Sequence, residues 1–283
     1  MADVHYFTYG WLTPVLAYGM SFIGSLLGLE FASRARGMAG GSRARWLAGA
    51  AVAIGGTGIW VMHFIAMLGF TVTGVPIRYD VPLTLASAVA AVVVTGAGLF
   101  IIGFTKPRLV PLLLGGLVTG SGVAAMHFMG MAALHVGAKV HYDATLVALS
   151  VLIAIVAATA ALWAALWVRG LPATLGAAAI MAFAVSGMHY TGMAAMQVHS
   201  GMTMDTPAGS PALDLLLPLI LGVSVVTAGL LLTIGVLPSE TERRSEEELR
   251  ERIGRRWNGP NGCHTSPGSS AGAHPAVREA ISR

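Results

Sequence analysis

Seven long apolar segments constrain the fold of this chain more than any other feature of its sequence. Within lipid, only helices and closed barrels pair all of their backbone polar groups, and a spanning helix needs about 20 mostly apolar residues. Charged residues make up 11% of the 283 residues, against about 25% in soluble domains. The sequence therefore predicts an all-α membrane protein with seven transmembrane helices, at residues 12–31, 46–68, 83–103, 109–134, 144–168, 173–198 and 213–237.

Basic residues between these segments predict how the helices are oriented. The first, third and fifth connections hold seven Lys and Arg residues, whereas the second and fourth hold two. Cytoplasmic connections carry such an excess, so we expect the N-terminus outside and the C-terminus in the cytoplasm. The first residues have no basic region before the first apolar run and do not look like a cleaved signal peptide.

Composition divides the chain into two parts. Residues 6–237 form the predicted membrane domain, and residues 238–283 are charged at first and then rich in Gly, Ser and Pro. We expect most of this cytoplasmic tail to be disordered, and it is too short for a catalytic output domain of ordinary size. No nucleophile–base pair or phosphate loop is evident, so we do not expect an enzyme. In a membrane protein the formal charge of +4 does not indicate a nucleic-acid partner.

A repeated motif lies inside three of the apolar segments. The stretches "WVMHFIAMLGF" (60–70), "AAMHFMGMAAL" (124–134) and "SGMHYTGMAAM" (186–196) align, and their histidines His63, His127 and His189 are 64 and 62 residues apart. The repeating unit is thus a pair of helices, present roughly three times. In the predicted topology all three motif helices run the same way. Repeats around one bundle axis would therefore bring the three histidines together near the outer face.

The residues around each histidine suggest a metal. A methionine follows each histidine by four residues, on the same helix face, and another precedes it; in the third copy Met196 extends this face. Imidazole and thioether together favour copper, especially soft Cu(I). Zinc prefers His with Cys or carboxylate, and calcium and magnesium prefer oxygen ligands. We therefore predict a copper site.

Packing is the alternative explanation of the motif. Methionine commonly fills gaps in apolar cores, and a buried histidine can simply bond a neighbouring helix. A duplication can preserve a packing motif as well as a site. However, an ionisable residue inside a membrane span is a functional candidate by default, and three copies share one depth and one spacing.

Two further patterns lie near the predicted outer face. Tyr-Asp pairs precede the third and fifth segments, where Asp80 and Asp143 are placed to cap helix N-termini. Four histidines lie in the outer connections, where they are either exposed loop residues, which we favour, or a vestibule for metal entry: His5, His135, His141 and His199. The glycines of "GGTG" (55–58) and "GGLVTG" (115–120) predict close approach between helices.

On these residues the sequence resembles the MHYT integral membrane sensor domain. "MHYTGM" (188–193) looks like its signature, and "MHFIAM" (62–67) and "MHFMGM" (126–131) look like degenerate copies. The resemblance covers about residues 6–237. It implies a bacterial inner-membrane sensor of a diatomic gas such as oxygen, carbon monoxide or nitric oxide. By the same resemblance the gas is sensed through copper held by Met62, His63, Met67, Met126, His127, Met131, Met188, His189 and Met193.

The chain departs from the family pattern in two respects. Phe64 and Phe128 replace the motif tyrosine, and Thr191 has no counterpart in the first two copies, which puts a general role for a motif hydroxyl in doubt. Members often carry cyclic-di-nucleotide or histidine-kinase output domains, and none follows here. A sensor of this form would need a separate cytoplasmic signalling partner.

The sequence is also compatible with two other functions. A copper transporter or store should carry ligands through the whole membrane depth, but the inner halves of the motif helices hold few candidates, with Met181 and Met20 the main ones. A b-type haem protein would use histidines on facing helices as axial ligands. The methionines and the three-fold pattern fit haem less well.

Overall fold

The computed structural model describes residues 4–5, 7–73, 76–137, 139–199, 209–236 and 248–254. The chain divides into two units, Met1–Pro238 and Ser239–Arg283. In the second unit, residues 248–254 are helical. The prediction that most of the tail is disordered applies to residues that lie outside the described ones.

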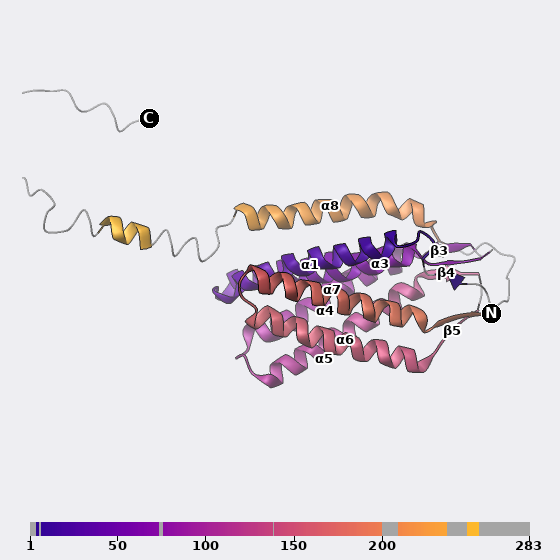
Figure 1. Cartoon of the computed structure of the whole chain (residues 1–283), viewed down its shortest axis with the longest axis horizontal. Helices are drawn as coiled ribbons and strands as arrows, with labels where there is room; N and C mark the ends of the chain where they lie inside the picture. The colour runs from indigo at the N-terminus through magenta and orange to yellow at the C-terminus, as the bar shows by residue number, and fades with distance from the viewer. Residues whose placement is uncertain are drawn as a thin grey trace, which may run out of the picture. The chain divides into compact units, whose positions relative to one another are not determined.

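Seven helical runs of the described residues are long and apolar enough to cross a membrane, which confirms the predicted class (Figure 1). The direction of insertion stays a prediction. The second run consists of three consecutive helices. The bounds are α1 Leu12–Arg36, α2 Gly40–Ala51, η1 Val52–Trp60, α3 Val61–Leu68, α4 Val81–Phe104, α5 Leu109–Ala132, α6 Ala144–Trp167, α7 Leu171–Ala194 and α8 Ala212–Val236.

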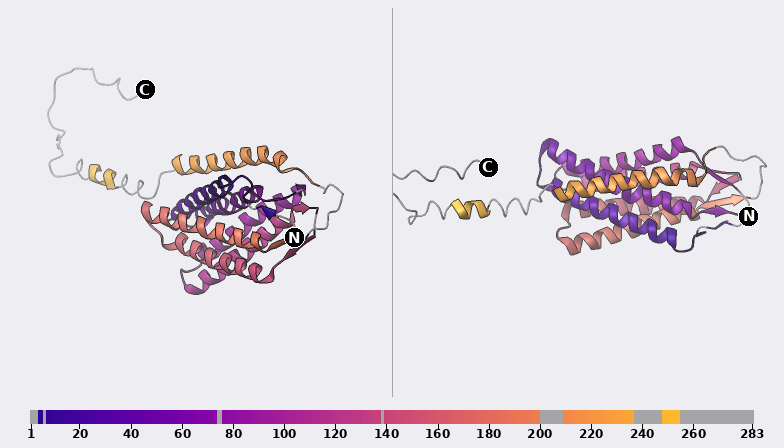
Figure 2. Two further views of the ribbon diagram at one scale, coloured as in Figure 1. Left: turned by 45° about the vertical axis from the view of Figure 1, so that its right-hand side comes forward. Right: turned by 90° about the horizontal axis from the view of Figure 1, so that it is seen from above.

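The helices pack as a ring around a common interior. Helices α4 to α7 pack against their neighbours in sequence, α7 packs against α1, and α1 packs against η1, which in turn contacts α4. Helix α8 lies along the outside of this ring beside α1 and η1 (Figures 1 and 2). The interior is therefore enclosed by α1, η1 with α3, and α4 to α7.

A π-helix interrupts the second run directly before the first motif. Its nine residues include "GGTG", and Val61 donates its N–H to the carbonyl of Gly56, five residues back. A Cβ on Gly24 of α1 would overlap the backbone of Gly58, and one on Gly55 would overlap that of Ala91 in α4. The predicted close approach of helices at this stretch is confirmed. π-Helical turns are rare and frequently occur at functional sites.

Three short antiparallel strand pairs join the ends of the helices, and the sequence analysis did not predict them. They are β1 Val4–His5 with β2 Thr71–Val72, β3 Ile77–Tyr79 with β4 Leu134–Val136, and β5 Lys139–Tyr142 with β6 Met196–His199. The predicted helices at 109–134 and 173–198 were too long, because their last residues, Leu134 and Met196 to Val198, pair as strands β4 and β6. Met196 therefore lies in β6 and does not extend the face of His189.

The predicted helix caps are confirmed. The carboxylate of Asp80 accepts a bond from Leu83 N at 2.8 Å, and that of Asp143 accepts from Thr145 N at 2.9 Å and Leu146 N at 3.1 Å. The backbone N–H groups of the same two residues donate to the carbonyls of Ala133 and Ala195, both at 2.9 Å. Each Tyr-Asp pair thus fixes the start of one helix to the end of a motif helix.

Candidate metal centre

The three motif histidines meet inside the bundle. The Nδ1 of His63 lies 3.0 Å from that of His189 and 3.1 Å from that of His127. The ring centroids are 4.9, 5.0 and 5.1 Å apart, and the rings are steeply inclined to one another. No ring is more than 2% exposed. Three imidazole nitrogens therefore converge on one buried point.

The repeat places these histidines at one level. Each lies five residues before the last residue of its helix, which is Leu68 in α3, Ala132 in α5 and Ala194 in α7. Because a strand or turn begins just beyond each of these ends, the histidines stay about one and a half helical turns inside the ends of their helices.

Glycines make room for two of the rings. A Cβ on Gly130 would overlap Nε2 of His63, and a Cβ on Gly192 would overlap Nε2 of His127. Each glycine follows the histidine of its own helix by three residues but accommodates the histidine of a neighbouring helix. The equivalent residue of the first copy is the buried Ala66, so the three-fold arrangement is imperfect.

The nitrogen atoms of the cluster suit a cation. A neutral imidazole has one N–H and one lone pair, and here the Nδ1 atoms face one another while Nε2 of each ring has no hydrogen-bond partner among the described residues. A packing motif would instead direct the ring nitrogens at backbone carbonyls. Metal–N bonds of about 2.0 Å in a trigonal set require N–N separations of about 3.5 Å, so small outward shifts of the rings would accommodate a metal.

Charge favours a monovalent ion at this point. The described cluster consists of three histidines and includes no carboxylate or thiolate, so the ligand set is neutral. The cost of burying a charge rises with its square and is large without a partner of opposite sign. Cu(I) therefore fits the three neutral nitrogens better than a divalent ion does, and it accepts imidazole and thioether ligands.

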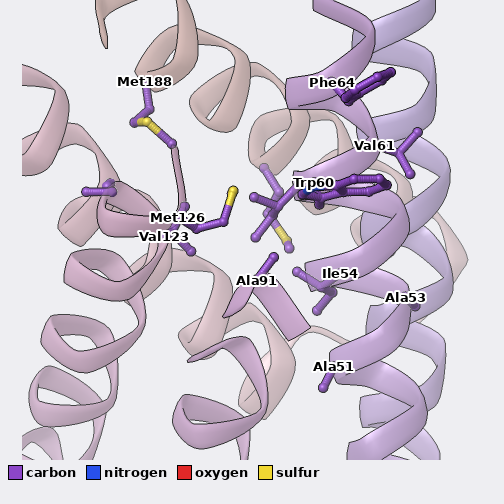
Figure 3. Packing of buried hydrophobic residues seen from close by; sticks show 14 of the residues in the cluster. Ala51, Ala53, Ile54, Trp60, Val61, Phe64, Ala91, Val123, Met126 and Met188 are labelled. Carbon is purple, nitrogen blue, oxygen red and sulfur yellow. The ribbon is translucent and has the colours of Figure 1, made fainter. Parts of the chain in front are cut away.

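The six motif methionines are all buried around the histidines, each no more than 2% exposed. Figure 3 shows Met126 and Met188 among the buried side chains between the helices. Met62 packs with Ala17 of α1 and Ala66, and Met67 lines a small cavity beside His63. The structure brings the three histidines together, whereas coordination by the methionines stays a prediction.

A small cavity adjoins His63, lined also by Tyr79, Ser87 and Gly130. Its volume of about 10 Å³ is close to what one water needs. Trp60 Nε1 donates to Ser87 Oγ at 2.9 Å, and this hydroxyl donates to the carbonyl of Thr84 at 2.6 Å. Burial raises the pKa of Tyr79 above its usual range, with a smaller contribution from Tyr9, so its phenol stays protonated beside the cluster.

Sequence reasoning missed Tyr79, although a signal was present. The repeated Tyr-Asp pair was interpreted for its aspartate alone. Tyr79 packs on Phe64 with centroids 5.6 Å apart, and Tyr142 packs on Phe128 at 6.0 Å. The aromatic residue after each of these histidines thus contacts the tyrosine of a Tyr-Asp pair, which explains why phenylalanine serves at the motif position.

The outer histidines lie apart from this cluster. His5, His135, His141 and His199 belong to strands β1, β4, β5 and β6. Ile77 to Tyr79 pair with residues 134–136, and Lys139 to Tyr142 pair with residues 196–199. These histidines are therefore strand residues. The metal-ligand cluster found among the described side chains does not include His5, His135 or His141, and the side chain of His199 lies outside the described ones.

Comparison with known proteins accounts for the repeated arrangement. The sequence model of the MHYT family, described as a bacterial signalling protein N-terminal repeat, matches residues 56–116, 120–178 and 183–244. The chain belongs to the MHYT family. Each MHYT match contains one histidine of the cluster and the helix that follows it, and helix α8 is accordingly the counterpart of α4 and α6.

Other members of the family are signalling proteins. The chain is 36% identical over 195 residues to the bifunctional diguanylate cyclase/cyclic di-GMP phosphodiesterase MucR of Pseudomonas aeruginosa, covering 67% of this chain and 28% of that protein. It is 34% identical over 208 residues to the cyclic di-GMP phosphodiesterase NbdA of the same species, covering 69% and 25%. It is 30% identical over 162 residues to the signalling protein YkoW of Bacillus subtilis, covering 55% and 20%.

These MHYT relatives are much longer proteins. The chain spans about a quarter of the length of the curated relatives that it matches. No solved structure matches it. Family membership and the seven spans make this chain a multi-pass membrane protein with a signalling role.

Proposed function

We propose that this protein is a copper-dependent membrane sensor that responds to a diatomic gas or to redox state. The observation that carries the proposal is the convergence of His63, His127 and His189, with Nδ1 atoms 3.0 and 3.1 Å apart in a buried and neutral site. When bound, copper supplies a redox-active centre with room for a further ligand. The three histidines hold it, and the surrounding methionines exclude water and offer soft donors.

Arginines at the other end of the bundle are placed to report a change at this site. Arg43 donates to the carbonyl of Gly103 in α4 at 2.9 Å, Arg36 to that of Ala165 in α6 at 2.8 Å, and Arg34 to that of Ile234 in α8 at 2.9 Å. The second helix of each repeat (α4, α6 or α8) is thereby hydrogen-bonded to α1 or α2 near its own last turn. A shift of α3, α5 and α7 relative to one another would change these hydrogen bonds at the proposed cytoplasmic face.

We also propose where the protein lies and what receives its output. The protein spans the bacterial inner membrane, with the lipid bilayer around the ring of helices. Its output passes to a separate cytoplasmic signalling partner. Because two relatives are named for cyclic di-GMP enzymes, we propose that this partner belongs to cyclic-di-nucleotide signalling. No nucleic-acid partner and no catalytic activity of the membrane unit are proposed.

The same geometry disfavours the two other functions. Ring centroids about 5 Å apart leave no room for a porphyrin between any two of the histidines. Of the two methionines proposed as inner ligands of a conduit, Met181 is buried and Met20 half-buried, and the described His, Cys, Asp and Glu residues form no second cluster toward that side. A one-sided binding site fits better than a path across the membrane.

Metal analysis tests the proposal directly. Protein purified from copper-supplied cells should contain copper and show no haem absorption, and replacing His63, His127 and His189 by alanine should remove the copper. The matched control replaces three strand histidines, His135, His141 and His199, and should keep it. Full copper in the first triple variant would overturn the assignment of the site.

A further inference from the structure

A second cavity lies on the bundle axis next to the histidine cluster. Its volume is about 40 Å³, and none of its lining residues is exposed. The residue four positions before each histidine lines it in all three repeats, namely Ile59, Val123 and Val185. Since four residues span about one helical turn, the cavity begins one turn below the three imidazoles, toward the proposed cytoplasmic side.

The lining changes character along the axis. At the histidine end it is apolar, formed by these three residues together with Met188; Figure 3 shows Val123 and Met188 in this interior. Farther from the histidines the lining includes the hydroxyls of Thr95 and Thr119, and Ser25 of α1 lines the cavity at the level of Gly58. Thr119 lies eight residues, or about two turns, before His127. Its hydroxyl donates to the carbonyl of Val94 at 3.3 Å, whereas the buried hydroxyl of Thr95 has no hydrogen-bond partner among the described residues.

The size of the cavity restricts what can enter it. A volume of about 40 Å³ exceeds the roughly 10–15 Å³ that one water needs and is far below the roughly 300 Å³ of ordinary ligand pockets. Most of the lining is apolar, and apolar cavities stay dry and take up apolar molecules such as xenon. Small residues of α6 keep this space open, since Ala154, Ala158 and Ala161 line one side. The cavity therefore fits a molecule of two heavy atoms.

The cavity also stands where a ligand of the histidine centre would approach. Three imidazoles arranged around a point leave the two directions along the bundle axis free of protein nitrogen. One of these directions leads into the cavity, past Met188. We infer that this cavity, named the axial chamber, is a docking site for a diatomic gas on its way to the histidine centre. The inference rests on the proposed function, because it assigns a route to the same site.

Xenon tests the axial chamber without relying on copper. Xenon-pressurised crystals or ¹²⁹Xe NMR of the purified protein should show one xenon in the chamber of the wild type. The variant Val123→Ile/Val185→Ile adds one methylene at each of two lining positions and should reduce xenon occupancy at least fivefold. A matched control, Val89→Ile/Val156→Ile, alters valines that are 63% and 61% exposed on the outer surface of the bundle and should leave it unchanged.

Two outcomes would overturn the inference. Wild-type protein without xenon in the chamber, or with ordered water filling it, shows that the chamber does not take apolar gas. Equal xenon occupancy in the filled variant shows that the xenon lies elsewhere. Copper content is measured in every sample. Xenon without copper in the wild type would contradict the proposed function alone, and copper without xenon would contradict the axial chamber alone.

A second readout links the chamber to the centre. In the copper-loaded, reduced protein, carbon monoxide should bind at least fivefold more slowly to the filled variant than to the outer-surface control. Equal rates in the two proteins would contradict the role of the chamber as a route, even if xenon binds there.

Discussion

Nε2 of His63 lies against the backbone of Gly130, where any side chain would overlap it. His127 has the same relationship to Gly192. The glycines of the second and third motifs are thus each required by a histidine from another repeat, which links the repeats at the centre. A substitution at Gly130 or Gly192 should therefore disturb the histidine cluster without weakening the helix that contains the glycine.

The variant Gly130→Ala should lose copper while its helix remains intact. The new methyl group displaces the His63 ring, and we expect copper affinity to fall at least tenfold. Alanine is favoured over glycine in helices by about 1 kcal/mol, so helicity should not decrease. Metal titration and circular dichroism together measure both effects.

The control for this substitution is Gly187→Ala. Gly187 lies in α7, and an added Cβ there meets no described atom within 4 Å. This variant should bind copper as the wild type does. Wild-type affinity in Gly130→Ala would show that the ring position is not needed for binding.

The motif methionines can be tested as ligands separately from packing. Leucine has a similar volume, and such swaps usually cost less than about 1.5 kcal/mol of stability. Replacing Met67, Met131 and Met193 by leucine should therefore preserve the fold but lower Cu(I) affinity at least tenfold in a competition with a Cu(I) chelator. Unchanged affinity would assign these methionines to packing alone.

The neutral ligand set predicts that the site prefers a monovalent over a divalent metal ion. The wild type should bind Cu(I) more tightly than Zn(II), because three neutral nitrogens offset less of a divalent charge. Competition titrations with each ion and X-ray absorption at the copper edge measure this preference. Tighter binding of zinc would contradict the charge argument and require an anionic ligand.

Much of the fold could be predicted because two signals were strong. Apolar length identified all seven spans, and the repeat placed His63, His127 and His189 at one level. The strand pairs were missed because each strand has only two to four residues, too few for an alternating pattern to be recognised. The π-helix was missed because its i to i+5 bonding leaves no periodic signal in "VAIGGTGIW".

The candidate site was predictable in composition but not in orientation. Spacing put histidine and methionine on one helix face, yet it could not say that Nδ1 faces the centre and Nε2 faces Gly130 or Gly192. Ring orientation depends on contacts between helices that are distant in sequence. The bonds of Arg34, Arg36 and Arg43 to helix ends were likewise hidden, because their charge was used only to predict orientation.

The variant Arg36→Lys tests the hydrogen bonds that join α1 to the end of α6. The guanidinium of Arg36 donates to the carbonyls of Ala165 and Val168, at 2.8 and 2.9 Å. Lysine keeps the charge but presents a single ammonium group, without the planar fork of arginine. We expect a loss of about 1–3 kcal/mol in the free energy of unfolding, measured in detergent. The exposed Arg45, changed to lysine, is the control and should show no loss.

Tyr79 should make the stability of the protein depend on alkaline pH. Burial raises the pKa of its phenol in the folded state, whereas the unfolded chain ionises near pH 10. Below pH 10 both states are protonated, so the shift has no effect. Above it the unfolded state loses its proton first, so stability falls as pH rises. In thermal unfolding, the variant Tyr79→Phe should lose less stability than the wild type between pH 8 and pH 10.5. An equal loss in the two proteins would show that Tyr79 is not the responsible group.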